Sequence, residues 1–406
     1  MKKELLIQKR KKAKELHNNN WSIRKISRYL VASKKSIVKW INFDDKEALK
    51  DNRGWKRGRL RKYAPEAKEE IKKIRIELEK EESYFVGAKV VKYNYEKMNK
   101  SKVSKSFVDR TLKEAGMVTS PQKKRHELSK YMKYPQRTLT KIGKSMMSID
   151  FIGPKYLHGS GGGVSFLSCK YIRPDKHGIV KRVSGQTTEQ TIKILEEIWE
   201  NNPIPDVIKL DNDSAFGTNL SHDKCIGKLA LFFLNLGVTP LYVAPRSPWN
   251  NGENEGFNSV FSKKFWNRLQ FTDEDEVDIK IKDFNVAYEK YTKLIFNNPK
   301  KDLTTKYLDD FKNVDLDNKY VKKFKSKNIH FLRIVRRKNE KGSDKEYGFI
   351  NILNQEIKIS KELINLFVFC TLDLQSKKLK ISTEIDNGLL SEVKSIKFEI
   401  ENIIYP

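Results

Sequence analysis

Three acidic residues occur where the surrounding sequence predicts a strand or the start of a helix. Asp150 lies inside the apolar run Met146 to Pro154, Asp211 directly follows the apolar run Val207 to Leu210, and Glu255 follows an Asn-Gly pair. Carboxylates from separate elements are the ligands that Mg²⁺ prefers, with water and substrate phosphate completing the shell. Two such ions, Mg²⁺ or Mn²⁺, held about 4 Å apart, can activate a hydroxyl that attacks phosphorus and stabilise the leaving oxygen. We expect Asp150 to bridge both ions, Asp211 to hold one and Glu255 the other.

Most acidic side chains are solvated or salt-bridged, so each assignment needs its own reason. Asp150 has one, because a carboxylate between apolar neighbours on a strand near the core is costly without a cation. Glu253 is a rival for the third ligand, and Asp213 is a competitor for a metal. Asn258 lies one helical turn after Glu255 and either positions a ligand or DNA, or is a plain surface residue.

The elements that must position these residues begin at residue 145. Three β-rich runs are followed by alternating helices and strands. The expected strands are 145–157, 164–173, 178–183, 207–210 and 239–244, and the expected helices are 187–201, 222–236 and 252–269. This order predicts a mixed α/β layer with carboxylates on strands and at one helix start.

Three blocks of sequence resemble the integrase catalytic core that retroviral integrases share with bacterial insertion-sequence transposases. The blocks are Asp-Phe-Ile-Gly-Pro at 150–154, Asp-Asn-Asp-Ser-Ala-Phe at 211–216 and Ser-Pro-Trp-Asn-Asn-Gly-Glu-Asn-Glu-Gly-Phe-Asn at 247–258. The resemblance covers residues 145–300. It implies a ribonuclease H-like fold and a catalytic, metal-binding Asp-Asp-Glu triad of Asp150, Asp211 and Glu255.

Two features depart from the pattern of that family. Asp213 stands where the family usually has Gly, so the loop after the strand is expected to differ. The interval between Asp211 and Glu255 is 43 residues, longer than is usual, and we place the excess in the loop 216–221. The spacing Asn-Gly-x-x-Glu selects Glu255 over Glu253 as the third ligand.

The resemblance also implies a reaction and partners. In that family the core hydrolyses a phosphodiester to expose a 3′ hydroxyl, which attacks target DNA directly and without ATP. The implied partners are transposon terminal inverted repeats and target DNA, on which a homo-oligomer assembles. Retroviral integrases carry a zinc-binding His/Cys module, whereas here His17, His126 and His222 lack partners at suitable spacing, apart from a weak pairing of His222 with Cys225. This favours the bacterial transposase branch.

Two other functions agree with parts of the sequence. One is a DNA-binding regulator with an inactive core, and the other is a ribonuclease H-like nuclease that cuts without strand transfer. The presence of all three carboxylates argues against an inactive core. The block from Trp249 to Asn258 argues against a generic nuclease.

Positive charge is concentrated at the front of the chain. Residues 1–140 contain 40 Lys and Arg against 17 Asp and Glu, whereas residues 141–406 contain 42 against 35. Such a field suits a polyanion and, with interspersed Trp and Tyr, nucleic acid. A coding bias that raises the lysine content everywhere is the alternative explanation.

A helix-turn-helix is expected near the start of the chain. Ser22 and Ser33 can cap two short helices, 23–30 and 34–41. We expect Ile37, Val38 and Ile41 to face inward, and we expect DNA contacts from the outward residues Lys34, Lys35, Ser36 and Lys39. An ordinary small helical bundle with a solvated lysine face is the alternative.

Further contacts to DNA are expected in three places. They are Arg57 and Arg59 in a basic arm, Lys102 and Lys105 in a second helix-turn-helix-like module, and Lys263 and Lys264 after Glu255. The arm is suited to a narrow A·T-rich minor groove, although a solvated tether would look the same. For the lysines, simple exposure to solvent is the default.

The predicted organisation is a multidomain α/β protein in which helical DNA-binding modules precede the core and a small β-barrel follows it. Its parts are a helix-turn-helix module (1–50), a basic linker (51–64), a second such module (65–120), a linker (121–144), the core (145–300), a connector (301–328) and the barrel-like domain (329–406). Three scattered cysteines and the lack of a long apolar run lead us to expect a cytoplasmic, nucleoid-associated protein without membrane contact.

Overall fold

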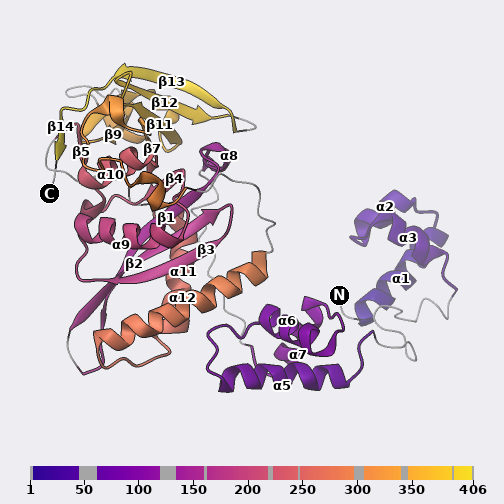
Figure 1. The fold of residues 1–406 in the computed structure, drawn as a ribbon. Helices are drawn as coiled ribbons and strands as arrows, with labels where there is room; N and C mark the ends of the chain where they lie inside the picture. Colours follow the sequence, from indigo (N-terminus) through magenta and orange to yellow (C-terminus); the bar gives the residue numbers. More distant parts are fainter. Residues whose placement is uncertain are drawn as a thin grey trace. The chain divides into compact units, whose positions relative to one another are not determined.

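A computed structural model of the chain describes residues 3–44, 62–118, 134–159, 162–217, 223–245, 247–296, 306–339, 346–385 and 388–404. The chain divides into two compact units, Met1–Ala67 and Lys68–Pro406, and each is considered by itself (Figure 1). None of the helices in these described ranges is long and apolar enough to cross a membrane.

Residues 3–44 of the N-terminal unit form three helices, α1 (Lys3–Asn18), α2 (Ile23–Tyr29) and α3 (Lys34–Ile41). The expected caps are present, because Ser22 accepts a hydrogen bond from the Lys25 N–H and Ser33 accepts one from the Ser36 N–H. The prediction that Val38 faces inward was wrong, since its side chain is 42% exposed, whereas Trp40 is buried with Ile37. The inner face of α3 therefore follows the i, i+3 spacing of Ile37 and Trp40.

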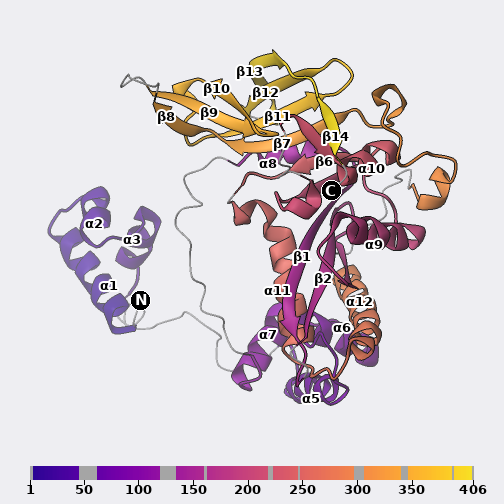
Figure 2. The same cartoon turned by 90° about the vertical axis from the view of Figure 1, so that its left-hand side faces the viewer.

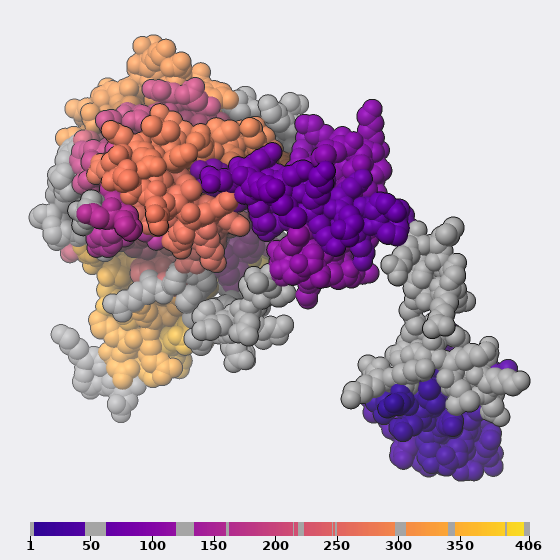
Figure 3. Space-filling view, turned by 90° about the horizontal axis from the view of Figure 1, so that it is seen from below, coloured from indigo at the N-terminus to yellow at the C-terminus, as the bar shows by residue number. Residues whose placement is uncertain are grey.

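A second group of helices belongs to the larger unit. It comprises α5 (Glu66–Lys80), α6 (Ala88–Asn99) and α7 (Lys105–Glu114). The segment between α5 and α6 packs on the longest helix of the core, α12 (Glu274–Phe296), where the Phe85 ring stacks on the Tyr291 ring with centroids 4.3 Å apart. Figure 3 shows the violet helices in direct contact with the orange α12 segment. These helices are thus attached to the core rather than freely linked to it.

The core is built around one nine-stranded sheet with the order β13-β12-β11-β7-β6-β4-β1-β2-β3. Its strands are β1 (Met146–Tyr156), β2 (Gly163–Arg173), β3 (His177–Val183), β4 (Val207–Leu210), β6 (Thr239–Tyr242), β7 (Asn328–Ile334), β11 (Phe367–Asp373), β12 (Lys378–Glu384) and β13 (Leu390–Lys397). Strands β1, β4, β6 and β7 are parallel to one another, and the flanking strands pair antiparallel. This mixed α/β sheet is compatible with a ribonuclease H-like core.

Helices cover both faces of the sheet. Strand alternation along β1 turns Met147 and Ile149 toward α9 (Thr188–Asn201) and α10 (Lys228–Leu236), and turns Ser148 and Asp150 toward α11 (Gly252–Phe261). Figure 2 shows α9 and α11 on opposite sides of β1 and β2.

The helices near the core differ from the expected ones in three details. The expected helix 222–236 begins only at α10, because Cys225–Gly227 forms the short strand β5. The expected helix 252–269 is divided into α11 and a π-helical turn, Ser262–Trp266. A short helix, α8 (Gln136–Lys141), occupies part of the expected linker 121–144. Single turns of 3₁₀ helix occur at Ser214–Phe216, Pro248–Asn251, Leu308–Phe311, Val321–Lys323 and Lys361–Leu363.

The C-terminal strands do not form the separate barrel that we expected. Strand β7 pairs with β6, with Leu241 opposite His330 and Tyr242 opposite Phe331, so the sheet of the core continues into residues 328–397. An exposed apolar edge on β6 would invite association, and the pairing with β7 covers it. Shorter strands complete this region, namely β8 (Arg336–Asn339), β9 (Glu346–Ile352) and β10 (Gln355–Ile359) in one sheet and β14 (Asn402–Ile404) beside β5.

Candidate active site

Asp150 lies in the middle of β1, the third strand from the β3 edge of the sheet. It stands opposite Ser168 of β2, and both side chains lie under α11. Asn258 Nδ2 donates a hydrogen bond of 2.8 Å to Asp150 Oδ2. Burial, followed by the charge of Asp211, raises the pKa of Asp150 to about 7, whereas the bond from Asn258 opposes this rise. The carboxylate is therefore held in a place that disfavours its negative charge unless a cation is near.

Asp211 follows the last residue of β4 and lies beside Asp150. Ser148 pairs with Lys209 in the parallel β1–β4 ladder, so two residues further along each strand the chain reaches Asp150 and Asp211. The Asp213 N–H donates to Asp211 Oδ1 at 3.0 Å. Burial raises the pKa of Asp211, which the hydrogen bond from Asp213 partly offsets.

Glu255 and Glu253 both lie in the first turn of α11 but differ in surroundings. Glu253 forms an ion pair with Lys176 at 3.4 Å. Glu255 is exposed, and its charge is the smallest of the contributions to the raised pKa of Asp150. Glu253 is thus engaged in an ion pair, and the choice of Glu255 as third ligand stays a prediction from the sequence spacing.

The Asp213 carboxylate is engaged in local structure. Its Oδ1 accepts the Ala215 N–H at 2.9 Å and so begins the 3₁₀ turn that follows β4. An aspartate fits this role because its short side chain reaches the N–H two residues further on. We therefore assign Asp213 to the loop, where glycine was expected from the resemblance.

The carboxylate oxygens of the site suit a hard cation such as Mg²⁺, but they do not surround a single position as a complete set of ligands would. No group of three or more His, Cys, Asp or Glu side chains within the described residues is placed to hold a metal ion. Two neighbouring, largely buried carboxylates nevertheless offer the oxygen ligands that Mg²⁺ and Mn²⁺ take, and Asn258 Oδ1 is buried without a hydrogen-bond partner beside them. Asp150 and Asp211 fit a pair of ligands, whereas the exposed Glu255 does not complete a group of three with them among the described residues.

Three asparagines at the start of α11 and along it attach this helix to β1 and β2. The Ser148 hydroxyl donates to Asn251 Oδ1 at 2.6 Å, and the Ser168 hydroxyl lies 3.3 Å from Asn254 Oδ1. With the bond from Asn258 to Asp150, these contacts form a polar row along one helix face. Of the three, only Asn258 was expected near the site, although the spacing of 251, 254 and 258 is that of one helix face.

Two buried lysines on the same sheet face were also missed. Lys170 and Lys209 are each 6% exposed, and burial lowers the pKa of each to about 8. Lys170 Nζ donates to the Tyr288 hydroxyl at 3.0 Å. The available signal was a lysine inside an apolar strand on either side of the predicted site, Lys170 in β2 and Lys209 in β4.

The expected DNA contacts are spread over several elements. Lys34, Lys35 and Lys39 are exposed on α3, whereas Ser36 is partly buried and bonded to Ser33. Lys102 is exposed before α7, and Lys263 is exposed on the π-helical turn, whose Lys264 is partly buried with its pKa lowered by burial. Arg57 and Arg59 lie outside the described residues.

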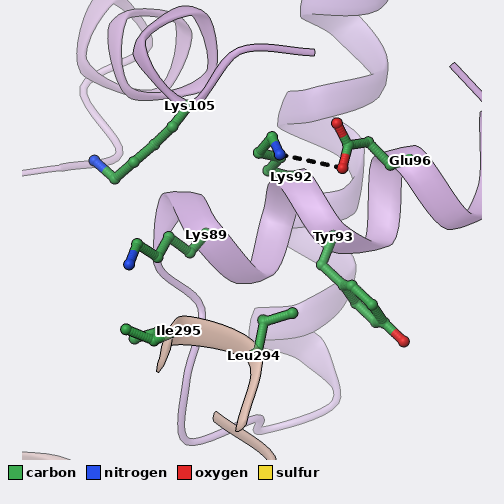
Figure 4. Close-up of a pocket in the computed structure, with 7 residues that line it drawn as sticks. All are labelled: Lys89, Lys92, Tyr93, Glu96, Lys105, Leu294 and Ile295. Carbon is green, nitrogen blue, oxygen red and sulfur yellow. Dashed lines mark ion pairs between the residues drawn. The ribbon is translucent and has the colours of Figure 1, made fainter. Parts of the chain in front are cut away.

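Lys105 forms an ion pair with Asp109 and also lines a hollow of about 230 Å³ between α6 and the end of α12. Figure 4 shows Lys89, Lys92 and Lys105 around this hollow, above Leu294 and Ile295. Lys92 is paired with Glu96, so two of the three ammonium groups are already balanced by carboxylates.

Similarity of this chain to known proteins is found among solved structures and not in sequence. No protein-family model matches the chain, and no curated protein matches it in sequence. Among solved structures, a simian T-cell lymphotropic virus intasome in complex with PP2A regulatory subunit B56 gamma is similar at 9% identity and a TM-score of 0.31, over 72% of this chain and 88% of that chain. A Mos1 mariner paired end complex with Mn is similar at 12% identity and a TM-score of 0.26, over 71% and 92%. The Mos1 complex with Mg gives 12% identity and a TM-score of 0.20, over 71% and 94%.

Proposed function

We propose that this chain is a metal-dependent DNA transposase or integrase, which cleaves DNA at transposon ends and joins the ends to target DNA. The observation that carries the proposal is that the parallel pairing of β1 and β4 brings Asp150, within β1, beside Asp211, which directly follows β4. In the family that the three sequence blocks resemble, these positions hold the catalytic metals. A ribonuclease H-like architecture and the use of two ions belong to the same proposal.

Asp150, Asp211 and Glu255 would hold the divalent ions. When bound, such ions activate a water or hydroxyl as nucleophile and stabilise the leaving 3′ oxygen. The chain itself contributes orientation: Asn258 holds one oxygen of Asp150, and the Asp213 N–H holds one oxygen of Asp211. Fixing both side chains before the metal binds lowers the entropy that must be lost to reach the reactive arrangement.

The test compares strand nicking and joining on supercoiled plasmid, with Mg²⁺ or Mn²⁺, by the intact protein and four variants. Asp150→Asn, Asp211→Asn and Glu255→Gln each remove one proposed ligand. Glu253→Gln is the matched control, because it makes the same chemical change in the same helical turn but at a residue paired with Lys176.

We expect metal-dependent products from the intact protein and from Glu253→Gln, and loss of product by at least about 100-fold in each ligand variant. Retention of activity in Glu255→Gln together with its loss in Glu253→Gln would reassign the third ligand. If the intact protein binds DNA but never cuts it, a regulator with an inactive core is favoured. Nicking without any joining would favour a nuclease.

A further inference from the structure

Arg333 on β7 is a buried cation that no carboxylate balances within the described residues. Its side chain is 6% exposed. Its Nε donates to the Asn351 carbonyl at 2.9 Å, and its Nη1 donates to the Val243 carbonyl at 3.0 Å and to the Leu332 carbonyl at 2.9 Å. Burial lowers the pKa of the guanidinium to about 10, so it remains charged at neutral pH. Three backbone carbonyls and the face of the Phe331 ring, 5.2 Å from Arg333 Cζ, offset the cost of burying this charge.

One of these carbonyls belongs to Val243, which is hydrogen-bonded to both chain neighbours of Asp211. The Val243 N–H donates to the Leu210 carbonyl at 3.0 Å. The Val243 carbonyl accepts Asn212 Nδ2 at 2.7 Å in addition to Arg333 Nη1. The residues immediately before and after Asp211 are thus tied to the same residue, Val243. Leu210 pairs with Tyr242, so the bond from the Val243 N–H continues the β4–β6 ladder, whereas the contacts of the Val243 carbonyl with Asn212 and Arg333 lie beyond that ladder.

The shape of the guanidinium explains how one side chain can serve both neighbours. Nε and Nη1 point in different directions, one toward β9 and the other toward the end of β6. A lysine has a single nitrogen at the end of a flexible stem and cannot reproduce this fork. If the side chain at position 333 served only to stabilise β7, an apolar residue of similar volume would do so without the cost of burying a charge.

We propose that Arg333 is a positioning residue that, through Val243, fixes the backbone on both sides of Asp211. The C-terminal strands thereby set the position of an acidic residue of the site, in addition to closing the sheet edge. This inference rests on the proposed function for the role of Asp211. We call the contacts of Arg333 with Val243, and of Val243 with Leu210 and Asn212, the clamp. The existence of the clamp does not depend on the proposed function, so it can be tested without measuring catalysis.

The first test is amide hydrogen exchange of the metal-free full-length protein. The variants are Arg333→Met, which removes the fork, and Arg333→Lys, which keeps charge and length and remains measurable if the first variant folds poorly. Ile381→Val is the matched control, because Ile381 is a fully buried residue of β12 remote from Val243. It weakens the C-terminal strands without touching the clamp.

Loss of a charge-assisted hydrogen bond typically raises the equilibrium constant for local opening about tenfold. In Arg333→Met the amides of peptides covering 208–217 and 239–245 should therefore exchange about tenfold faster than in the intact protein. Arg333→Lys should give an intermediate increase, and Ile381→Val should leave both peptides unchanged. Unchanged exchange at 208–217 in both Arg333 variants, or an equal increase in Ile381→Val, would overturn the proposal.

The second test is the nicking assay with the metal concentration varied. Arg333→Lys should lower kcat and raise the Mn²⁺ concentration needed for half-maximal rate, with the KM for DNA unchanged, since Asp211 moves while the DNA-contacting lysines do not. A change in KM alone would contradict the positioning role. If the intact protein shows no nicking, the proposed function fails, while the exchange experiment still decides whether the clamp exists.

Discussion

Asp150→Asn should stabilise the metal-free protein while abolishing its activity. The pKa of Asp150 is raised from 3.8 to about 7, chiefly by burial and then by Asp211, so folding favours the protonated form. The stability linked to this proton is fully present below about pH 4 and is lost as the pH rises to about 7. At pH 8 the ionised side chain therefore destabilises the folded state, and an amide removes that penalty.

The magnitude follows from the shift. About three pH units correspond to roughly 4 kcal/mol, and because Asp150 is partly exposed we expect about half of this, roughly 2 kcal/mol, as the gain in the free energy of unfolding. The unpartnered Asn258 Oδ1 would gain an amide donor nearby, which acts in the same direction. A gain of this size should raise the Tm of the larger unit by about 4 °C.

Thermal unfolding at pH 8 in EDTA, followed by a repeat with Mg²⁺, measures both parts of this prediction. Mg²⁺ should raise the Tm of the intact protein and leave that of Asp150→Asn unchanged. Asp206→Asn is the matched control, because the Asp206 carboxylate accepts the N–H groups of Lys144 and Ser145 at 2.7 and 2.9 Å, so its amide variant should be less stable. A lower Tm for Asp150→Asn in EDTA, or equal Mg²⁺ shifts in both proteins, would refute the reasoning.

Three further predictions concern other parts of the chain. Asn285→Ala should lower the free energy of unfolding by about 2 kcal/mol in a denaturant titration, because the Asn285 amide bonds both the N–H and the carbonyl of Val180 at 2.9 Å on the outer edge of β3. Phe85→Ala should cost about 3 kcal/mol by removing its stack on Tyr291, and limited proteolysis should then release α5–α7 from the core faster than in the intact protein. Lys35→Ala on α3 should weaken DNA binding for all sequences alike and reduce the slope of log affinity against log salt by about one; an unchanged slope would remove Lys35 from the interface.

Local signals predicted many elements of the fold. The caps at Ser22 and Ser33, the strand that ends before Asp211 and the helix start before Glu255 all depend on residues within one or two turns. The same local reasoning failed for Val38, because a helix of two turns offers several inward faces and the large Trp40 ring determined which one is buried. Burial in so short a helix is decided by its neighbours.

Long-range pairing was beyond the reach of the sequence. Strand β7 was expected to belong to a separate barrel, yet Leu241 pairs with His330 and the Tyr242 ring stacks on Phe331 with centroids 5.4 Å apart. The residue pattern of β7 is the same whether this strand pairs with β6 of the core or with another strand of a separate barrel. The separation of 90 residues in sequence likewise concealed the contact of Arg333 with Val243.

The asparagine row on α11 explains how the position of Glu255 is fixed without a partner of its own. Apolar helix contacts tolerate small sliding movements, whereas a shift of α11 would break the bonds of Asn251 to Ser148 and of Asn258 to Asp150 together. Each buried polar group left unpaired would cost about 1–3 kcal/mol. Glu255 lies between these two asparagines on the helix, so its backbone is held on both sides while its exposed side chain stays available. The polar face of α11 therefore fixes the position of the helix along the sheet, which apolar contacts alone would not do.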